Sequence, residues 1–148
     1  MKSFPENQLL LETTTLRVKI LKKRDMTKKE IAQNFLKLAS GGNPRKAFEL
    51  YVAEEFKHHN PYYKGDRETL MLGMEESHME SPNKVFEMLR ALEDGNLVAV
   101  HSRVQQQGKD GWKGAVVHIF RFSNNKIVEL WDIGQAVPDE IINENGLF

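Results

Sequence analysis

Two polar side chains, those of Asp132 and His118, interrupt apolar rows in the C-terminal part of the chain. Side chains at alternate positions of a strand share a face, and this rule gives both residues apolar neighbours: Val128 and Leu130 for Asp132, and Val116, Phe120 and Phe122 for His118. A carboxylate or an imidazole on such a face is costly unless it is paired or neutral. His118 lies six residues before the Asn124-Asn125 pair and Asp132 seven residues after it, which is compatible with neighbours across a hairpin. Either residue alone is most simply structural, but the pair indicates a site.

The run His58-His59-Asn60-Pro61 is a second candidate for chemistry. It ends a short extended stretch predicted at residues 56–59, because proline disfavours helix at the residue before it. A surface loop explains this run equally well. His101 also lies in an apolar strand, but Arg103 shares its face, so the sequence leaves open whether His101 meets a pocket or solvent.

The elements that must position these residues are helices in the first half of the chain and strands in the second. Thr27 and Glu30 have the spacing of a capping box, Asp66 can cap another helix, and Asp94-Gly95 and Asn124-Asn125 are typical of tight hairpin turns. The predicted helices span residues 28–40, 44–52 and 67–80, and the predicted strands span 84–92, 97–106, 113–122 and 127–135. Helices and strands segregated in this way, with short turns between strands, predict an α+β fold with an antiparallel sheet.

Length and composition narrow the classes of function. A chain of 148 residues suits one domain, predicted at 27–148 after an N-terminal extension at 1–26, in which residues 16–20 are compatible with an edge strand or a short helix. The 21 basic and 21 acidic residues balance, so no net charge favours nucleic acid or a membrane surface. The absence of cysteine excludes disulfides and thiolate zinc sites. No membrane span or secretory signal is evident, which makes the cytoplasm the expected compartment.

Several segments together resemble a known family. They are His59-Asn60-Pro61, residues 62–65, residues 95–101, Phe120-Arg121-Phe122 and, most specifically, residues 126–132. From about Thr27 to its C-terminus the chain resembles the SnoaL-like polyketide cyclase branch of the nuclear-transport-factor-2-like superfamily. The resemblance implies a curled antiparallel sheet that forms a cone-shaped half-barrel, closed by about three N-terminal helices around a ligand cavity. In the cyclases a histidine on the penultimate strand and an aspartate on the last strand line that cavity, and these positions correspond to His118 and Asp132.

The resemblance also implies acid–base chemistry on a small carbonyl compound, as in an aldol-type cyclase, an isomerase or a related lyase. Asp132 would move a proton α to the carbonyl, and His118 would donate a hydrogen bond to the enolate. An apolar wall raises the pKa of a carboxyl group and makes it a better base near neutral pH. Neither a metal nor an organic cofactor is required. The candidates for substrate binding are His59, Asn60, Tyr62, His101, Trp131 and Gln135.

Two partners are expected, a small apolar molecule that contains a carbonyl group and a second copy of the chain. Alternation places Ile127, Trp131 and Ile133 opposite Asp132, as an apolar outer surface that a homodimer would cover, with Leu147-Phe148 adding to it. Two alternatives to an enzyme stay open. One is a cavity that binds a small ligand without catalysis, and the other is a dimerisation module whose cavity is filled by its own side chains.

Overall fold

The computed structural model of this protein describes residues 26–108 and 110–148. The segment 16–20, expected as a strand or a helix, lies outside the described residues. The helices are α2 (Lys28–Ser40), α3 (Pro44–Tyr51) and α4 (Arg67–Glu80), and the strands are β1 (Val52–His58), β2 (Val85–Asp94), β3 (Leu97–Gln105), β4 (Lys113–Ser123) and β5 (Lys126–Ala136). The predicted α+β fold is confirmed, and the three predicted helices and four predicted strands end within two residues of the expected positions.

Local signals in the sequence account for where the helices begin. The side chain of Thr27 accepts a hydrogen bond from the backbone of Glu30, whose side chain accepts one in return, so the capping box predicted for α2 is present. Pro44 occupies the first turn of α3, where its missing N–H costs nothing. The side chain of Asp66 caps α4 by accepting from the backbone N–H of Thr69.

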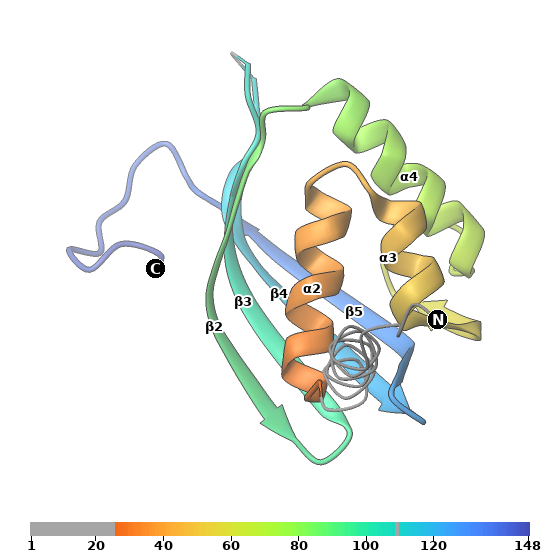
Figure 1. Cartoon of the computed structure of the whole chain (residues 1–148). Coiled ribbons are helices and arrows are strands. Elements are labelled where there is room, and N and C mark those ends of the chain that lie inside the picture. The colour runs from red at the N-terminus through yellow and green to blue at the C-terminus, as the bar shows by residue number, and fades with distance from the viewer. Residues whose placement is uncertain (1–25, 109) are drawn as a thin grey trace, which may run out of the picture.

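The five strands form one unclosed sheet in the order β1-β5-β4-β3-β2, and the sheet curls around the helices on its concave side (Figure 1). Strands β2 to β5 pair in sequential antiparallel hairpins, as predicted. The sequence did not predict that β1 adds to the edge of β5 in parallel, with His58 beside Leu130. A parallel neighbour requires a long connection, and here α4 and β2–β4 supply it.

The hydrophobic core lies between the helices and the concave face of the sheet. Its largest fully buried side chains include Phe35 of α2, Phe48 of α3 and Phe120 of β4, and Phe35 meets each of the other two rings edge-on. Such contacts add about 0.5–1.5 kcal/mol per aromatic pair beyond the burial of area. The α2–α3 unit is thereby fixed on the sheet, and the space beside it is bounded by α4 and the ends of the strands.

One prediction about the faces of β5 is wrong. Strict alternation from Asp132 places Ile127 on the outer face, but Ile127 is fully buried in the core and pairs with Phe122. The pairing of β4 with β5 shifts at this point, so that Arg121 pairs with Glu129 and Val128 has no partner. An extra residue of this kind, a β-bulge, reverses the alternation on one side of it.

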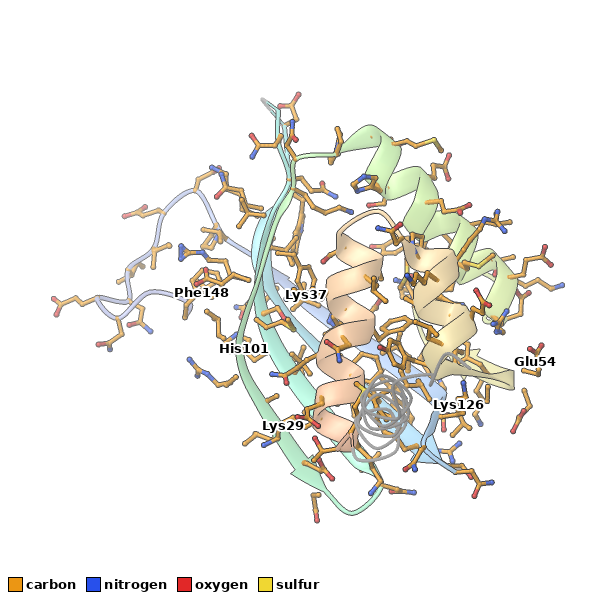
Figure 2. All side chains as sticks on the ribbon, in the orientation of Figure 1. Lys29, Lys37, Glu54, His101, Lys126 and Phe148 are labelled. Carbon is orange, nitrogen blue, oxygen red and sulfur yellow. The ribbon has the colours of Figure 1, made fainter. Side chains whose placement is uncertain are left out.

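The convex face of the sheet carries the end of the chain. The ring of Phe148 stacks on His101 with their centroids 6.4 Å apart, and the guanidinium carbon of Arg103 lies 5.2 Å from the centroid of the same ring. Figure 2 shows Phe148 and His101 on the side of the sheet away from the helices. The outward direction of His101, which the sequence left open, follows from this contact.

Candidate functional site

An open cavity of about 630 Å³ lies between the concave face of the sheet and helices α2 and α4. Its apolar wall includes Leu36 and Met74 from the helices and Phe86, Val104 and Val116 from the strands. Asp132 and His118 both line it, and so do Asn60 and Tyr62 from the loop after β1. The cavity is large enough for a small organic molecule.

The carboxylate of Asp132 is held by one neighbour across the cavity wall. The side-chain amide of Asn60 donates to Oδ2 of Asp132 over 2.7 Å, while Oδ1 of Asn60 accepts from the backbone N–H of Tyr62. This second bond fixes the orientation of the amide, so that its NH₂ group faces the carboxylate. Within the described part of the chain, no other hydrogen bond and no ion pair within 4.0 Å reaches Asp132. Its remaining acceptor capacity therefore faces the cavity.

His118 lies directly opposite Asp132 in the β4–β5 ladder. Opposite residues of an antiparallel pair have Cβ atoms about 4.5–5.5 Å apart, so the predicted neighbours are neighbours. The ring of His118 is buried between Phe86 and Phe120, and its Nδ1 has no hydrogen-bond partner among the described residues. Burial lowers the pKa of His118 to about 4, although the negative charge of Asp132 opposes the shift. The imidazole is therefore neutral near pH 7 and has both a donor and an acceptor nitrogen.

His58, the first residue of the run His58-His59-Asn60-Pro61, belongs to the same buried region, although only His59 and Asn60 of this run were expected to bind substrate. Its Nδ1 accepts from the backbone N–H of Asn60 over 3.1 Å, which places the proton on Nε2. That Nε2 is buried and unpartnered among the described residues. Burial lowers the pKa of His58, against the opposing charges of Asp132 and Asp66. Alternation could have found it, since His58 shares a face with the core residue Phe56.

Tyr63 is a second residue that the sequence did not single out. Its ring lies against Gly73 in the middle of α4, and a Cβ at Gly73 would lie only 2.2 Å from Cε1 of Tyr63. Tyr63 lines the cavity, whereas the predicted Tyr62 is 88% exposed and stands at the cavity mouth. Burial raises the pKa of Tyr63, and the charges of Glu76, Glu80 and Asp132 raise it further. The phenol therefore keeps its proton and can donate it in a hydrogen bond. A glycine inside a helix was the available signal.

The other four residues predicted to bind substrate do not line the cavity. His59 and Trp131 stack on each other with their ring centroids 4.9 Å apart and their planes 3° apart. Both lie on the convex face, beside Glu129. His101 faces the C-terminal Phe148, and Gln135 alternates with Gly134 and Ala136, which do line the cavity. These four residues are therefore not placed in the cavity: His59 and Trp131 lie with Glu129, His101 lies with Phe148, and Gln135 is absent from the lining.

Glu129 forms the centre of a cluster of charges on the convex face. Its side chain is 8% exposed and contacts Arg121 Nη2 at 2.7 Å, His59 Nε2 at 2.8 Å and Lys57 Nζ at 3.2 Å. Burial raises the pKa of Glu129, but hydrogen bonds from His59, Arg121 and Lys57 outweigh that effect and lower the pKa to about 2. We name these four residues the Glu129 cluster.

Residues 26–108 and 110–148 contain no group of three or more histidine, aspartate and glutamate side chains placed to hold a metal ion. None of the described helices is both long and apolar enough to cross a membrane.

The sequence of residues 32–130 matches the model of the SnoaL-like domain. This match covers well over half of the chain and includes β1, all three helices in whole or part, and the hairpins up to Leu130. The chain belongs to the SnoaL-like domain family. No curated protein sequence matches this SnoaL-like domain.

Solved structures resemble this SnoaL-like domain over most of its length. An NTF2-like protein of unknown function from Cytophaga hutchinsonii has 18% identity and a TM-score of 0.61, with 75% of this chain and 92% of that chain covered. A protein from Acidithiobacillus ferrooxidans, described as a candidate polyketide cyclase, has 15% identity and a TM-score of 0.60, with coverage of 75% and 90%. IdmH from Streptomyces antibioticus, also described as a candidate polyketide cyclase, has 14% identity and a TM-score of 0.63, with coverage of 74% and 93%. At these identities the likeness establishes the NTF2-like fold of the SnoaL-like domain, and its activity must be argued from the cavity.

Proposed function

We propose that this SnoaL-like domain is an acid–base enzyme that moves a proton α to the carbonyl group of a small molecule. The observation that carries the proposal is the state of Asp132, a carboxylate that lines an open cavity and is held by a single hydrogen bond from Asn60. A purely structural carboxylate is expected to be paired more fully, since each unsatisfied lone pair in a partly buried site costs free energy.

The proposed reaction uses groups of the chain alone. One oxygen of the Asp132 carboxylate takes the α-proton, and the electron pair of the broken C–H bond moves into an enolate. A neutral His118 or the phenol of Tyr63 donates a hydrogen bond to the enolate oxygen. Return of the proton from Asp132 to a different atom of the enolate gives isomerisation. Attack of the enolate carbon on a second carbonyl group forms the C–C bond of an aldol-type ring closure, and the alkoxide that results takes the proton back from Asp132. Proton transfer of this kind contributes about 10²–10⁴-fold, and an oriented donor adds about 10²–10³-fold.

The cavity itself argues against a module filled by its own side chains, because about 630 Å³ remains open. The distinction from a non-catalytic binding protein needs an experiment. In D₂O, an active Asp132 should exchange the α-protons of ketones such as cyclohexanone and acetophenone for deuterium, and proton NMR measures this loss. NMR line broadening identifies the ketones that bind. If the exchange of these ketones is no faster than in buffer alone, the enzyme proposal is wrong and the cavity only binds ligands.

We further propose that the convex face of the sheet forms a homodimer contact. Two exposed apolar side chains that alternate along their strands with inward-facing residues support it, those of Ile133 (59% exposed) and Leu97 (39% exposed), since the burial of exposed apolar surface is favourable. Trp131, also expected there, contacts His59 instead of standing free. Light scattering at micromolar concentration should give twice the chain mass, and Ile133→Glu should give the monomer mass. A monomer mass for the unaltered protein would contradict the proposal.

A further inference from the structure

Lys84 is a charged group inside the cavity that the proposed reaction does not use. It precedes β2 by one residue, shares the inward face of Phe86, and lines the cavity. Its Nζ donates to Oγ of Ser77 on α4 over 2.9 Å. The seven ion pairs found between described residues all involve other cations, so no described carboxylate lies within 4.0 Å of Lys84.

A partly buried ammonium without a counter-ion is costly, and burial alone lowers the pKa of Lys84. Asp132 does not compensate this charge. The two residues lie on or beside β5 and β2, with β4 and β3 between them. Neighbouring strands lie about 4.8 Å apart, so the two residues are separated by roughly 14 Å measured across the strands. The straight-line distance between the two strands is shorter because the sheet curls.

Other hydrogen-bond donors accompany Lys84 at the same end of the cavity. The β2–β3 register pairs Val85 with Gln105, and one step further it sets Lys84 opposite Gln106. Oε1 of Gln106 accepts from the backbone N–H of Trp112 over 3.3 Å. The NH₂ group of the Gln106 side chain therefore remains available as a donor. Ser77, Gln106 and Lys84 all line the cavity. An ammonium, an amide NH₂ and a hydroxyl together suit an anionic oxygen group such as a carboxylate.

We propose that Lys84, with Ser77 and Gln106, binds an anionic group of the ligand at the end of the cavity remote from Asp132. Taken with the proposed function, on which this step rests, the substrate is a carbonyl compound that carries a carboxylate or a similar anion several bonds away from the reacting carbon. This proposal differs from the expectation of an apolar ligand. Lys84 is a specificity-determining residue and takes no part in the proton transfer.

Two fluorescent probes with one skeleton test the anion site. They are 8-anilinonaphthalene-1-sulfonate, which is anionic, and N-phenyl-1-naphthylamine, which lacks the sulfonate. The unaltered protein should bind the anionic probe more tightly. Lys84→Met should lower the affinity for the anionic probe about tenfold or more, as expected for the loss of a hydrogen bond to a charged group. The affinity for the neutral probe should change less than twofold. Lys84→Arg should keep the preference for the anion.

Three controls make the result specific. Lys46→Met removes the same charge from an exposed position on α3 and should leave both probes unchanged. Val104→Trp fills the cavity and should lower the affinity for both probes. This loss would show that both probes bind in the cavity. If Lys84→Met does not fold, the unaltered protein still tests the proposal, because octanoate should displace the neutral probe at lower concentration than octanol.

Equal affinity of the two probes for the unaltered protein, or equal losses of both in Lys84→Met, would overturn the anion site. The outcome is separable from that of the proposed function. Asp132→Asn should abolish deuterium exchange and keep the preference for the anionic probe. A preference for the anionic probe without any exchange activity would retain the anion site and refute the enzyme.

Discussion

Asp132 and Glu129 are two carboxylates on one strand, only three residues apart, and their surroundings differ completely. Glu129, on the convex face, meets a guanidinium, an ammonium and an imidazole. Asp132, on the concave face, receives one hydrogen bond from an amide and faces an open cavity. The fully paired carboxylate is fixed in its charged form and contributes to stability. The sparsely paired carboxylate is the one that we propose as the base.

The largest expected effect tests the concave side of this comparison. Asp132→Asn is nearly isosteric and removes the base, so deuterium exchange of a bound ketone should fall about 10²–10⁴-fold. The melting temperature, measured by circular dichroism, should stay within a few degrees. The comparison fails if this variant retains a tenth or more of the activity, or if it loses stability instead.

The next effect is a pH dependence of stability that arises from His118. Its pKa is about 4 in the folded protein and about 6.5 in the unfolded chain, so the unfolded state binds the proton more tightly. Stability is complete above about pH 6.5 and decreases as the pH falls toward 4, by up to about 3 kcal/mol. Urea unfolding at pH 7 and pH 4.5 measures this loss. His118→Gln should reduce the difference between the two pH values, with a remainder from His58, whose pKa burial also lowers, and an unchanged difference would mean that His118 is not buried as described.

His118 should matter less to turnover than Asp132 does. His118→Ala removes one donor to the enolate and leaves the base in place, so the exchange rate should fall about 10²-fold, at the lower end of the range for an oriented donor because Tyr63 can still donate. The matched control is His101→Ala on the convex face, which should leave the rate unchanged. A larger loss in His118→Ala than in Asp132→Asn would assign the role of base to the imidazole.

The smallest effect tests the convex side. Glu129→Gln leaves Arg121, Lys57 and His59 without their shared anion, and the free energy of unfolding should fall by about 1–2 kcal/mol, moderated because these three partners are partly exposed. The exchange rate should change less than twofold, since the Glu129 cluster does not line the cavity. Loss of activity with full stability would reverse the roles of the two carboxylates.

Local rules in the sequence predicted the elements and the juxtaposition of His118 with Asp132. The capping box, the turn residues and the alternating strands each depend on neighbours a few positions away, and the pairing of His118 with Asp132 follows from one short turn. The bulge at Val128 was invisible to strict alternation, which is why Ile127 was misplaced. The roles of His58 and Tyr63 depend on the docking of β1 beside β5 and on the contact of Tyr63 with Gly73. Short-range patterns do not encode such long-range contacts.

The parallel docking of β1 on β5 has a consequence for folding. Strands β2 to β5 can assemble as successive hairpins, but the hydrogen bond between Asn60 and Asp132 joins residues 72 positions apart. Closure of such a loop costs more entropy than closure of a hairpin, and contacts of this range form slowly. During synthesis, β1 leaves the ribosome before its partner strand exists. We therefore expect the candidate site to be completed last, and a truncation before Lys126 to remove Asp132 and leave β1 without its partner strand.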